Sequence, residues 1–240
     1  MNCTRPSAMN QRLESTIRVL CPLIENRIRA RATNYWHEFD LRKELVACIL
    51  GSQVRYEMAT AATENLERAG LLDDFWWQGN RSDDFATRVF HVLSGQRYDL
   101  PYRGRYRFSK TRTGQLAHAR EVLAEVPLSA QLGRNGAARQ LRQSLVADIP
   151  GLGPKQASMF LRNIGRSYDL AILDTHVLRF MDMQELLPLD QARIGTMAGY
   201  ERAEQIVLDY ANALGYPAGY LDWAIWATMK AARELGLWAS

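Results

Sequence analysis

The amino-acid sequence predicts an all-α protein. Apolar residues recur at helical spacings of three and four along most of the 240 residues. Alternating β-branched segments separated by hairpin dipeptides, which would indicate strands, are nearly absent. The composition is 47% hydrophobic, with 30 Lys+Arg against 26 Asp+Glu and a net charge of +4. Such a balance is typical of a globular protein and excludes disordered, collagen-like and coiled-coil chains.

Three apolar stripes in the first half of the chain predict core helices. They cover residues 41–49, 58–66 and 85–93. The segment 73–81 is polar and contains two tryptophans, which predicts a loop. The segment 94–113 contains Pro and Gly but no apolar period, so we expect a long surface connection there.

The second half of the chain contains five further stripes of helical spacing. They cover residues 141–149, 157–164, 177–181, 201–214 and 218–235. The tetrapeptide Pro150-Gly151-Leu152-Gly153 separates the first two, which predicts a helix, a tight hairpin and a helix. Asp174 stands just before the third stripe, where it would cap the helix, and Gly215 and Pro217 end the fourth.

The cysteines and the N-terminus indicate a reducing compartment. The three cysteines, Cys3, Cys21 and Cys48, are too few and too far apart for a disulfide framework or for a zinc or iron–sulfur ligand set, so we expect no metal. The first apolar cluster, 19–24, is preceded by charges and interrupted by proline, unlike a secretory signal. The longest apolar runs are a few residues, far short of the roughly 20 that span a bilayer. We expect a cytoplasmic protein outside the membrane.

A basic stretch suggests nucleic acid as a partner. From residue 101 to residue 120 there is no acidic side chain. The stretch carries Arg103, Arg105, Arg107, Lys110, Arg112 and Arg120. Clustered Lys and Arg can follow a phosphate backbone, although an ordinary solvated basic loop would have the same composition.

The predicted hairpin could form an anion site. Gly151 and Gly153 allow positive φ and leave the backbone amides uncovered, and Pro154 suits the first position of the next helix. Bare amides at the positive end of a helix dipole can bind a phosphate. The alternative is a plain helical hairpin that binds no ligand.

Lys155 and Asp174 are candidates for chemistry as well as for structure. Lys155 falls in the first turn of a helix, where the dipole disfavours an ammonium and favours the neutral amine that nucleophilic attack requires. It could instead be a solvated lysine that contacts phosphate as a cation. Asp174 could be a plain N-cap, but an ionised carboxylate fixed at a helix start can also stabilise positive charge that develops nearby.

These residues resemble the helix-hairpin-helix DNA glycosylase superfamily. The segment 149–155, followed nineteen residues after Lys155 by Asp174 within 172–176, has the superfamily's hairpin, lysine and aspartate in the same order and spacing. The chain is most similar to the second family of 8-oxoguanine DNA glycosylase/AP lyases, and the resemblance covers residues 39–226. The further matching segments are Tyr106-Arg107-Phe108 with Lys110 and Arg112, Phe160-Leu161-Arg162-Asn163, residues 170–174, and Leu221-Asp222-Trp223 with Trp226.

The resemblance implies catalytic and phosphate-binding roles. Lys155 falls on the family's Schiff-base nucleophile and Asp174 on the carboxylate that assists base departure. Gly151 and Gly153 fall on positions whose backbone holds a DNA phosphate, and His176 on one that approaches a neighbouring phosphate, unless it is simply an exposed helical histidine. Related branches with an iron–sulfur cluster need four cysteines near the C-terminus, which this sequence lacks.

The resemblance also implies residues that handle the extruded base. Gln53 lies where relatives place a wedge that fills the gap left in the stack, although a surface turn could equally carry a glutamine. Asp222 and Trp226 are four apart, so they share a helix face that could offer a purine an acceptor and a stacking plane. Arg105 and Arg107 would follow the DNA backbone.

We therefore expect a helix-hairpin-helix glycosylase fold of two helical domains with an active cleft between them. One domain would cover 39–183, and the other would pair 1–38 with 184–240. The expected activity is bifunctional, releasing 8-oxoguanine from double-stranded DNA and cleaving the abasic site through a Lys155 Schiff base. We expect a monomer at the nucleoid that needs no cofactor. The alternatives are a glycosylase/lyase for another damaged base and a non-catalytic helix-hairpin-helix DNA-binding module.

Overall fold

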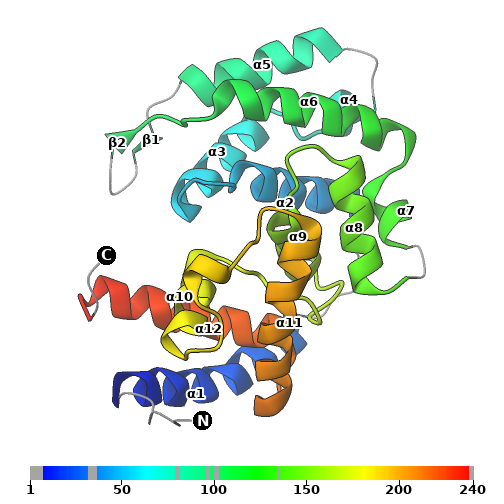
Figure 1. Ribbon diagram of the computed structural model, residues 1–240. Helices are drawn as coiled ribbons and strands as arrows, with labels where there is room; N and C mark the ends of the chain where they lie inside the picture. The colour runs from blue at the N-terminus through cyan, green and yellow to red at the C-terminus, as the bar shows by residue number, and fades with distance from the viewer. Residues whose placement is uncertain are drawn as a thin grey trace. The chain divides into compact units, whose positions relative to one another are not determined.

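The computed structural model describes residues 8–31, 37–78, 82–95, 98–99, 103–133 and 136–237. Most of these residues are helical (Figure 1). These residues form twelve α-helices, one 3-10 turn and a ribbon of two short antiparallel strands, β1 (Tyr98–Asp99) and β2 (Arg103–Gly104). The predicted all-α class is confirmed, with this ribbon as a small addition. None of the helices in the described ranges is long and apolar enough to cross a membrane.

The chain divides into two compact units. The central unit covers Tyr35–Arg166, and the chain-end unit combines Met1–Asn34 with Ser167–Ser240. The sequence analysis placed residues 167–183 in the central domain, whereas the structure packs them with the chain ends. The reason is their apolar side chains, since Val177, Phe180 and Met181 belong to the hydrophobic core of the chain-end unit.

Four helices and the 3-10 turn build the chain-end unit. They are α1 (Ala8–Arg31), α10 (Thr175–Met183), the 3-10 turn Leu189–Gln191, α11 (Met197–Leu214) and α12 (Ala218–Glu234). Helix α1, which lies beside α12 in Figure 1, was not predicted. Its buried residues Leu13, Ile17 and Cys21 are four apart, and Met9, Leu20 and Ile24 pack against the same core. Pro22 lies inside this helix and interrupts the apolar pattern.

Eight helices build the central unit. They are α2 (Glu38–Leu50), α3 (Tyr56–Arg68), α4 (Asp74–Trp77), α5 (Ser82–Gly95), α6 (Ser109–Glu125), α7 (Leu128–Leu132), α8 (Ala138–Asp148) and α9 (Pro154–Asn163). Two predicted loops are thus shorter than expected, because α4 occupies part of 73–81 and α6 begins at Ser109. Helix α6 also carries buried arginines in its apolar positions, which conceals its period from a hydrophobicity pattern.

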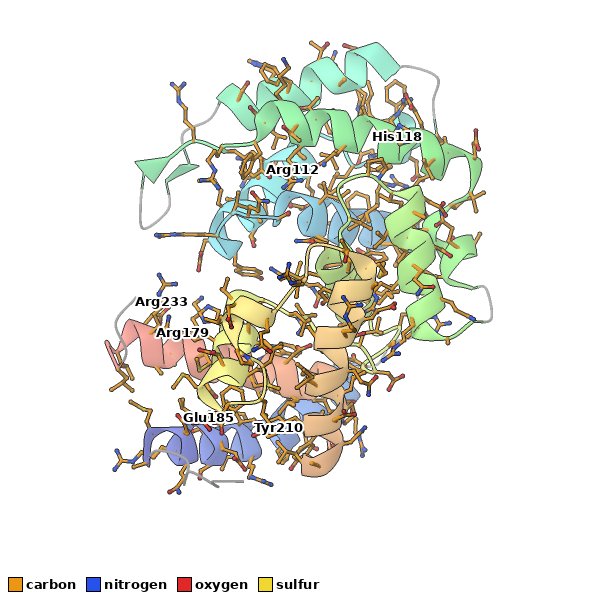
Figure 2. The ribbon with its side chains drawn as sticks, in the orientation of Figure 1. Arg112, His118, Arg179, Glu185, Tyr210 and Arg233 are labelled. Atoms are coloured by element: carbon orange, nitrogen blue, oxygen red, sulfur yellow. The ribbon has the colours of Figure 1, made fainter. Side chains whose placement is uncertain are left out.

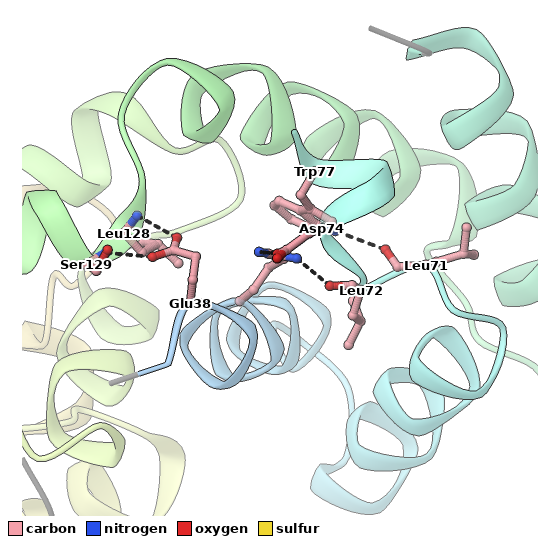
Figure 3. Close-up of polar contacts among 8 residues, drawn as sticks. Glu38, Leu71, Leu72, Asp74, Trp77, Leu128 and Ser129 are labelled. Carbon is pink, nitrogen blue, oxygen red and sulfur yellow. Dashed lines mark hydrogen bonds and ion pairs between the residues drawn. The ribbon is translucent and has the colours of Figure 1, made fainter. Parts of the chain in front are cut away.

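A buried arginine orders the segment that contains α4. Arg42 donates to the carbonyl of Leu72 at 2.5 Å and to the carboxylate of Asp74 at 2.6 Å (Figure 3). Its guanidinium also lies 5.4 Å from the ring centroid of Trp77, whose indole N–H donates to Leu71 O at 2.9 Å. A buried charge is costly unless it is hydrogen-bonded, so these contacts fix the position of α4 against α2.

The first residue of α2 holds a second element. The two carboxylate oxygens of Glu38 accept from the backbone N–H groups of Leu128 (2.8 Å) and Ser129 (3.0 Å), at the start of α7 (Figure 3). These N–H groups have no partner within their own helix, and a negative charge is favourable at a helix N-terminus. Helix α2 is therefore fixed at its start, and its other end leads into the turn described below.

Candidate active site

The hairpin between α8 and α9 has the predicted form, with one difference. Gly151 has a φ of 93°, a conformation that side chains rarely adopt. A Cβ at this position would lie 2.9 Å from the side chain of Gln115 and 3.1 Å from that of Ile49. Gly153, which the sequence analysis also expected at positive φ, is the extended N-cap of α9 with φ −82°. As a glycine it adds no side chain at the helix start, where a Cβ would lie 3.2 Å from Oε1 of Gln156.

Lys155 lies in the first turn of α9, directly after Pro154, and its side chain is half-buried. The opposite face of α9 is anchored in the unit by buried residues, and Ser158 accepts from the guanidinium of Arg142 on α8 at 3.1 Å. The lysine is thus held in the first turn of a fixed helix, at the positive end of its dipole. The predicted placement of Lys155 is confirmed, and its catalytic role stays a prediction.

The positive charge of Lys155 acts on the thiol of Cys48, which itself contacts the carboxylate of Glu44. Cys48 on α2 donates to Glu44 at 3.4 Å, and Glu44 also accepts from Asn163 at the end of α9 at 2.7 Å. Burial and the adjacent Glu44 raise the pKa of the Cys48 thiol, while the positive charges of Arg162 and Lys155 act in the opposite sense. The thiol therefore stays protonated. Within the described ranges no cluster of His, Cys, Asp and Glu side chains could hold a metal ion.

The turn after α2, residues 51–53, has a strained residue at its tip. Gln53 is exposed and has a φ of 62°, a left-handed conformation that is uncommon outside glycine. Such strain persists where surrounding contacts fix it, and it is frequent at functional sites. The sequence analysis predicted Gln53 as a wedge, and the strained, exposed position is compatible with that role.

Side chains from the basic stretch hold the carbonyls of this turn. The hydroxyl of Tyr106 donates to Leu50 O at 2.7 Å, Arg112 donates to Ser52 O at 2.9 Å, and Arg107 donates to Gln53 O at 3.1 Å. Arg112, which projects from α6 in Figure 2, also donates to Gln115 at 2.6 Å. Because Gln115 packs against Gly151, the turn and the hairpin are connected through Arg112.

The basic stretch is therefore partly structural rather than a continuous basic surface. Arg112 is 7% exposed and Arg120 is 4% exposed; Arg120 donates to the carbonyl of Trp76 and lies over the ring of Phe85. Arg105 and Arg107 are exposed, as their predicted contact with DNA requires. Composition indicates that a stretch is basic but cannot show which of its arginines are buried against carbonyls and aromatic rings.

Asp174 caps α10 in the chain-end unit. Its Oδ1 accepts from the backbone N–H groups of His176 at 2.9 Å and Val177 at 2.8 Å. The predicted N-cap is confirmed. His176 is half-buried in the first turn of the same helix, and its proposed phosphate contact is not tested by this geometry.

Asp222 and Trp226 lie on α12 as predicted, but their surroundings differ. Asp222 is 1% exposed, and its Oδ2 accepts from the backbone N–H of Ile172 at 2.8 Å. Trp226 is half-buried, with the ammonium of Lys230 5.0 Å from its ring centroid. Trp226 thus keeps an accessible surface for stacking, whereas Asp222 is engaged with the backbone just before Asp174.

Comparisons with known proteins identify the family. The family model described as 8-oxoguanine DNA glycosylase matches residues 90–216, just over half of the chain. The chain belongs to the 8-oxoguanine DNA glycosylase family. It is 35% identical over 205 residues to the 8-oxoguanine DNA glycosylase/AP lyase of Aquifex aeolicus, a match that covers 78% of this chain and 80% of that relative.

Solved structures of this glycosylase family have the same fold. The 8-oxoguanine DNA glycosylase of Thermotoga maritima is 27% identical, with a TM-score of 0.67 over 91% of this chain and 94% of its own. The 8-oxoguanine glycosylase/lyase of Methanocaldococcus jannaschii, in complex with a 15mer DNA that contains 8-oxoguanine, is 19% identical, with a TM-score of 0.61 over 94% of this chain and 92% of its own. The predicted helix-hairpin-helix glycosylase fold is confirmed.

The segment that matches the family model contains some of the predicted site residues but not all of them. Residues 90–216 include the hairpin, Lys155 and Asp174, while Gln53 and the α12 residues lie outside this segment. Sequence reasoning about this glycosylase missed Tyr200 and Glu204, which contact the backbone before Asp174. Tyr200 and Glu204 are four apart on a helix, as residues on one face of any amphipathic helix are. The sequence therefore gives no signal that distinguishes them.

Proposed function

We propose that this chain is a bifunctional enzyme that releases 8-oxoguanine from double-stranded DNA and then cleaves the DNA at the abasic site. The single observation that carries the proposal is Lys155 in the first turn of α9, directly after the glycine hairpin, in a chain of this family. The amine of a lysine can form a Schiff base with the C1′ carbon of a sugar, and this lysine lies next to the hairpin proposed to bind the DNA phosphate. The Aquifex aeolicus relative carries both activities in its name.

In the first step the neutral amine of Lys155 attacks C1′ of the damaged nucleotide. The bond between C1′ and N9 breaks, and the base leaves with the bonding electron pair and takes up a proton. Positive charge develops on the sugar as the base departs, and the carboxylate of Asp174 stabilises that charge. We propose that both residues act on the same nucleotide.

The second step breaks the DNA strand. The C1′ amine adduct loses a proton and opens the sugar ring to a Schiff base, a C1′=N bond between sugar and Lys155. Loss of a proton from C2′ then expels the phosphate at C3′ by β-elimination. Water hydrolyses the remaining imine and restores the amine, so the step needs no metal or redox partner.

Contacts to DNA phosphates would come from the hairpin and from the exposed basic residues. The backbone N–H groups of Gly151 and Gly153 belong to the hairpin that leads into α9, where the helix dipole favours an anion. We propose that His176 contacts a neighbouring phosphate and that Arg105 and Arg107 follow the DNA backbone. Such contacts position the duplex without reading its sequence.

The turn 51–53 would occupy the gap left by the extruded nucleotide. Gln53 is exposed at its tip, and its amide can hydrogen-bond the orphaned base on the other strand. The fixed backbone carbonyls of this turn keep Gln53 in its strained conformation. A wedge that is already ordered loses less conformational entropy when DNA binds.

One experiment tests the function directly. The protein is incubated with duplexes that each carry one lesion, and strand scission and borohydride trapping are measured. We expect both with 8-oxoguanine and with a preformed abasic site. Efficient release of a different base would overturn the substrate but keep the lyase, and binding without any scission would identify a non-catalytic DNA-binding module.

Arg105 and Arg107 should have the same effect on DNA binding but different effects on base release. Both are exposed, but Arg107 also donates to Gln53 O. We expect Arg105→Ala to weaken lesion and undamaged duplexes alike and to reduce the slope of log affinity against log salt by about 0.9, the contribution of one phosphate contact. Arg107→Ala should do the same and, in addition, slow base release. Affinity measured at several salt concentrations, with single-turnover kinetics, checks both; equal kinetics for the two variants would contradict the role of Arg107 at the turn.

Substitution of Trp226 should slow release of the base but not cleavage at a preformed abasic site. We propose that its half-buried ring stacks on the extruded purine. Trp226→Ala should lower release of 8-oxoguanine by at least about tenfold, because stacking on an aromatic ring contributes roughly 1–3 kcal/mol per base. Cleavage of a preformed abasic site should be retained, and Trp226→Phe should restore most of the base release. Equal losses on the two substrates would place Trp226 in the scaffold.

The protein would act as a monomer in the cytoplasm, at the nucleoid. The residues proposed for chemistry, for phosphate binding and for the base all come from one copy of the chain, and the substrate is chromosomal DNA. Size-exclusion chromatography at assay concentrations checks the monomer.

A further inference from the structure

The backbone just before Asp174 is buried but belongs to no helix or sheet. Residues Leu170, Ala171, Ile172 and Leu173 are each at most 5% exposed. Buried backbone N–H and C=O groups need hydrogen-bond partners, because leaving them without one costs free energy. An extended segment without a neighbouring strand must therefore find those partners elsewhere.

Side chains from two helices supply them. Glu204 on α11 accepts from the N–H of Ala171 at 3.1 Å, and Asp222 on α12 accepts from that of Ile172 at 2.8 Å. The hydroxyl of Tyr200, one turn before Glu204 on α11, accepts from the N–H of Leu173 at 3.1 Å and donates to the carbonyl of Ala171 at 2.8 Å. Three consecutive amides are thus bound by three side chains.

The three contacts alternate between the two helices. The N–H groups of residues 171 and 173 are bound by side chains of α11, and the N–H group of residue 172 between them is bound by a side chain of α12. A further contact, from the N–H of Gly219 on α12 to Tyr168 O at 2.8 Å, binds the chain just before this segment. The segment is held from both sides and cannot shift toward either helix.

Asp174 follows this segment directly. Its N–H donates to Ile172 O at 2.9 Å, and its carbonyl accepts from Leu178 N at 2.9 Å in the first turn of α10. Its carboxylate is in turn fixed by the two amides of α10. The direction of the carboxylate therefore depends on where the backbone of residues 171–173 lies.

We propose that Tyr200, Glu204 and Asp222 form a backbone clamp, whose task is to position Asp174 for base release. The proposal rests on the proposed function, in which Asp174 stabilises the sugar cation. It makes the three side chains positioning residues, and it gives Asp222 a role at the backbone rather than at the extruded base.

The chemical nature of the three clamp side chains supports a role in positioning the backbone rather than in filling the core. Glu204 is 0% exposed and Asp222 is 1% exposed, and a buried carboxylate is costly unless it is hydrogen-bonded. Hydrogen bonds from a backbone N–H to a carboxylate are shorter and stronger than those between neutral groups. An apolar core could fill the same space, but apolar contacts are non-directional and cannot bind individual N–H groups.

The clamp itself is tested without reference to activity. Amide hydrogen exchange is followed by mass spectrometry on peptides that cover 168–178, in the wild type and in Asp222→Ala, Asp222→Asn and Tyr200→Phe. We expect Asp222→Ala and Tyr200→Phe to speed exchange in these peptides, while Asp222→Asn, whose amide oxygen still accepts from Ile172 N, should exchange nearly as the wild type does. Thr228→Val, a substitution of similar branched shape at a buried position of α12 whose hydroxyl has no hydrogen-bond partner among the described residues, is the matched control. Unchanged exchange in both Asp222→Ala and Tyr200→Phe would overturn the clamp.

The consequence for Asp174 is tested by a double-mutant cycle on single-turnover release of 8-oxoguanine. We expect Asp222→Ala and Tyr200→Phe each to slow release by roughly 10- to 100-fold, since small misplacements of a catalytic group have effects of this size. Asp222→Asn and Thr228→Val should stay within about threefold of the wild type. In an Asp174→Asn background the two clamp variants should cause less than about threefold further loss, because the group that they position has lost its charge.

Two outcomes contradict the positioning role. Full multiplicative losses in the Asp174→Asn background would show that Tyr200 and Asp222 act independently of Asp174, as a direct base contact by Asp222 would. Base release unaffected by Tyr200→Phe and Asp222→Ala would show that the clamp does not matter for catalysis. If the wild type does not release 8-oxoguanine, the proposed function fails instead, and hydrogen exchange still decides whether the clamp holds the backbone.

Discussion

Lys155→Gln is expected to lose strand cleavage and borohydride trapping completely while binding a lesion duplex nearly as well as the wild type. The reason is that glutamine keeps most of the length of the side chain but has no amine that can form a Schiff base with C1′. The affinity should be largely retained because the hairpin amides proposed to bind phosphate are backbone groups and do not change with the side chain. Gel analysis of trapped complexes and a binding titration on the same duplex measure the two effects.

The chain offers a closely matched control for this prediction. Lys110 occupies the same position in α6, the second residue of the helix, and is exposed. Lys110→Gln should still be trapped at the wild-type rate, because the start of α6 is not preceded by the glycine hairpin. Trapping of Lys155→Gln at the wild-type rate would show that another amine attacks the sugar.

Few other side chains could take over that role. The sequence contains four lysines. Lys43 forms an ion pair with Glu67 at 2.8 Å, and Lys230 lies over the ring of Trp226. If Lys155→Gln remains active, the corresponding variants of Lys43, Lys110 and Lys230 identify the amine in three further measurements.

The hairpin and the helix caps could be predicted from the sequence because these features are local. A glycine at positive φ, a proline at the first helical position and an aspartate before a helix are determined by a few neighbouring residues, and Gly151, Pro154 and Asp174 all occupy the predicted positions. Gly153 shows the limit of this reasoning, since a glycine is compatible with positive φ but does not require it.

Features that depend on tertiary contacts were not accessible to the same reasoning. The boundary between the two units depends on which core receives Phe180 and Met181, and periodicity shows only that they are apolar. Arg112 and Arg120 look like surface residues until the carbonyls that they bind are known. The hydrogen bond between Asp222 and Ile172 N joins residues 50 apart in the sequence, which the spacing of Asp222 and Trp226 along α12 could not indicate.

Asp174→Asn is expected to slow single-turnover base release by about 10²- to 10³-fold, the range found when one group that stabilises transition-state charge is removed. The reason is that the substitution separates the two roles of this residue. Asparagine is nearly as good an N-cap as aspartate, so its oxygen can still accept from the amides of His176 and Val177. The melting temperature should therefore change little, while the charge that stabilises the sugar cation is lost.

A second N-cap in the same unit distinguishes catalysis from capping. The hydroxyl of Thr196 accepts from the N–H of Gly199 at the start of α11 at 3.2 Å, and no catalytic role is proposed for it. Thr196→Ala should lower the free energy of unfolding by about 1 kcal/mol, as loss of a cap typically does, with base release unchanged. Asp174→Asn should show the reverse, a large loss of base release with little change in stability. If Asp174→Asn instead loses stability and activity in proportion, the carboxylate acts as a structural cap, and the charge that assists base departure must come from another residue.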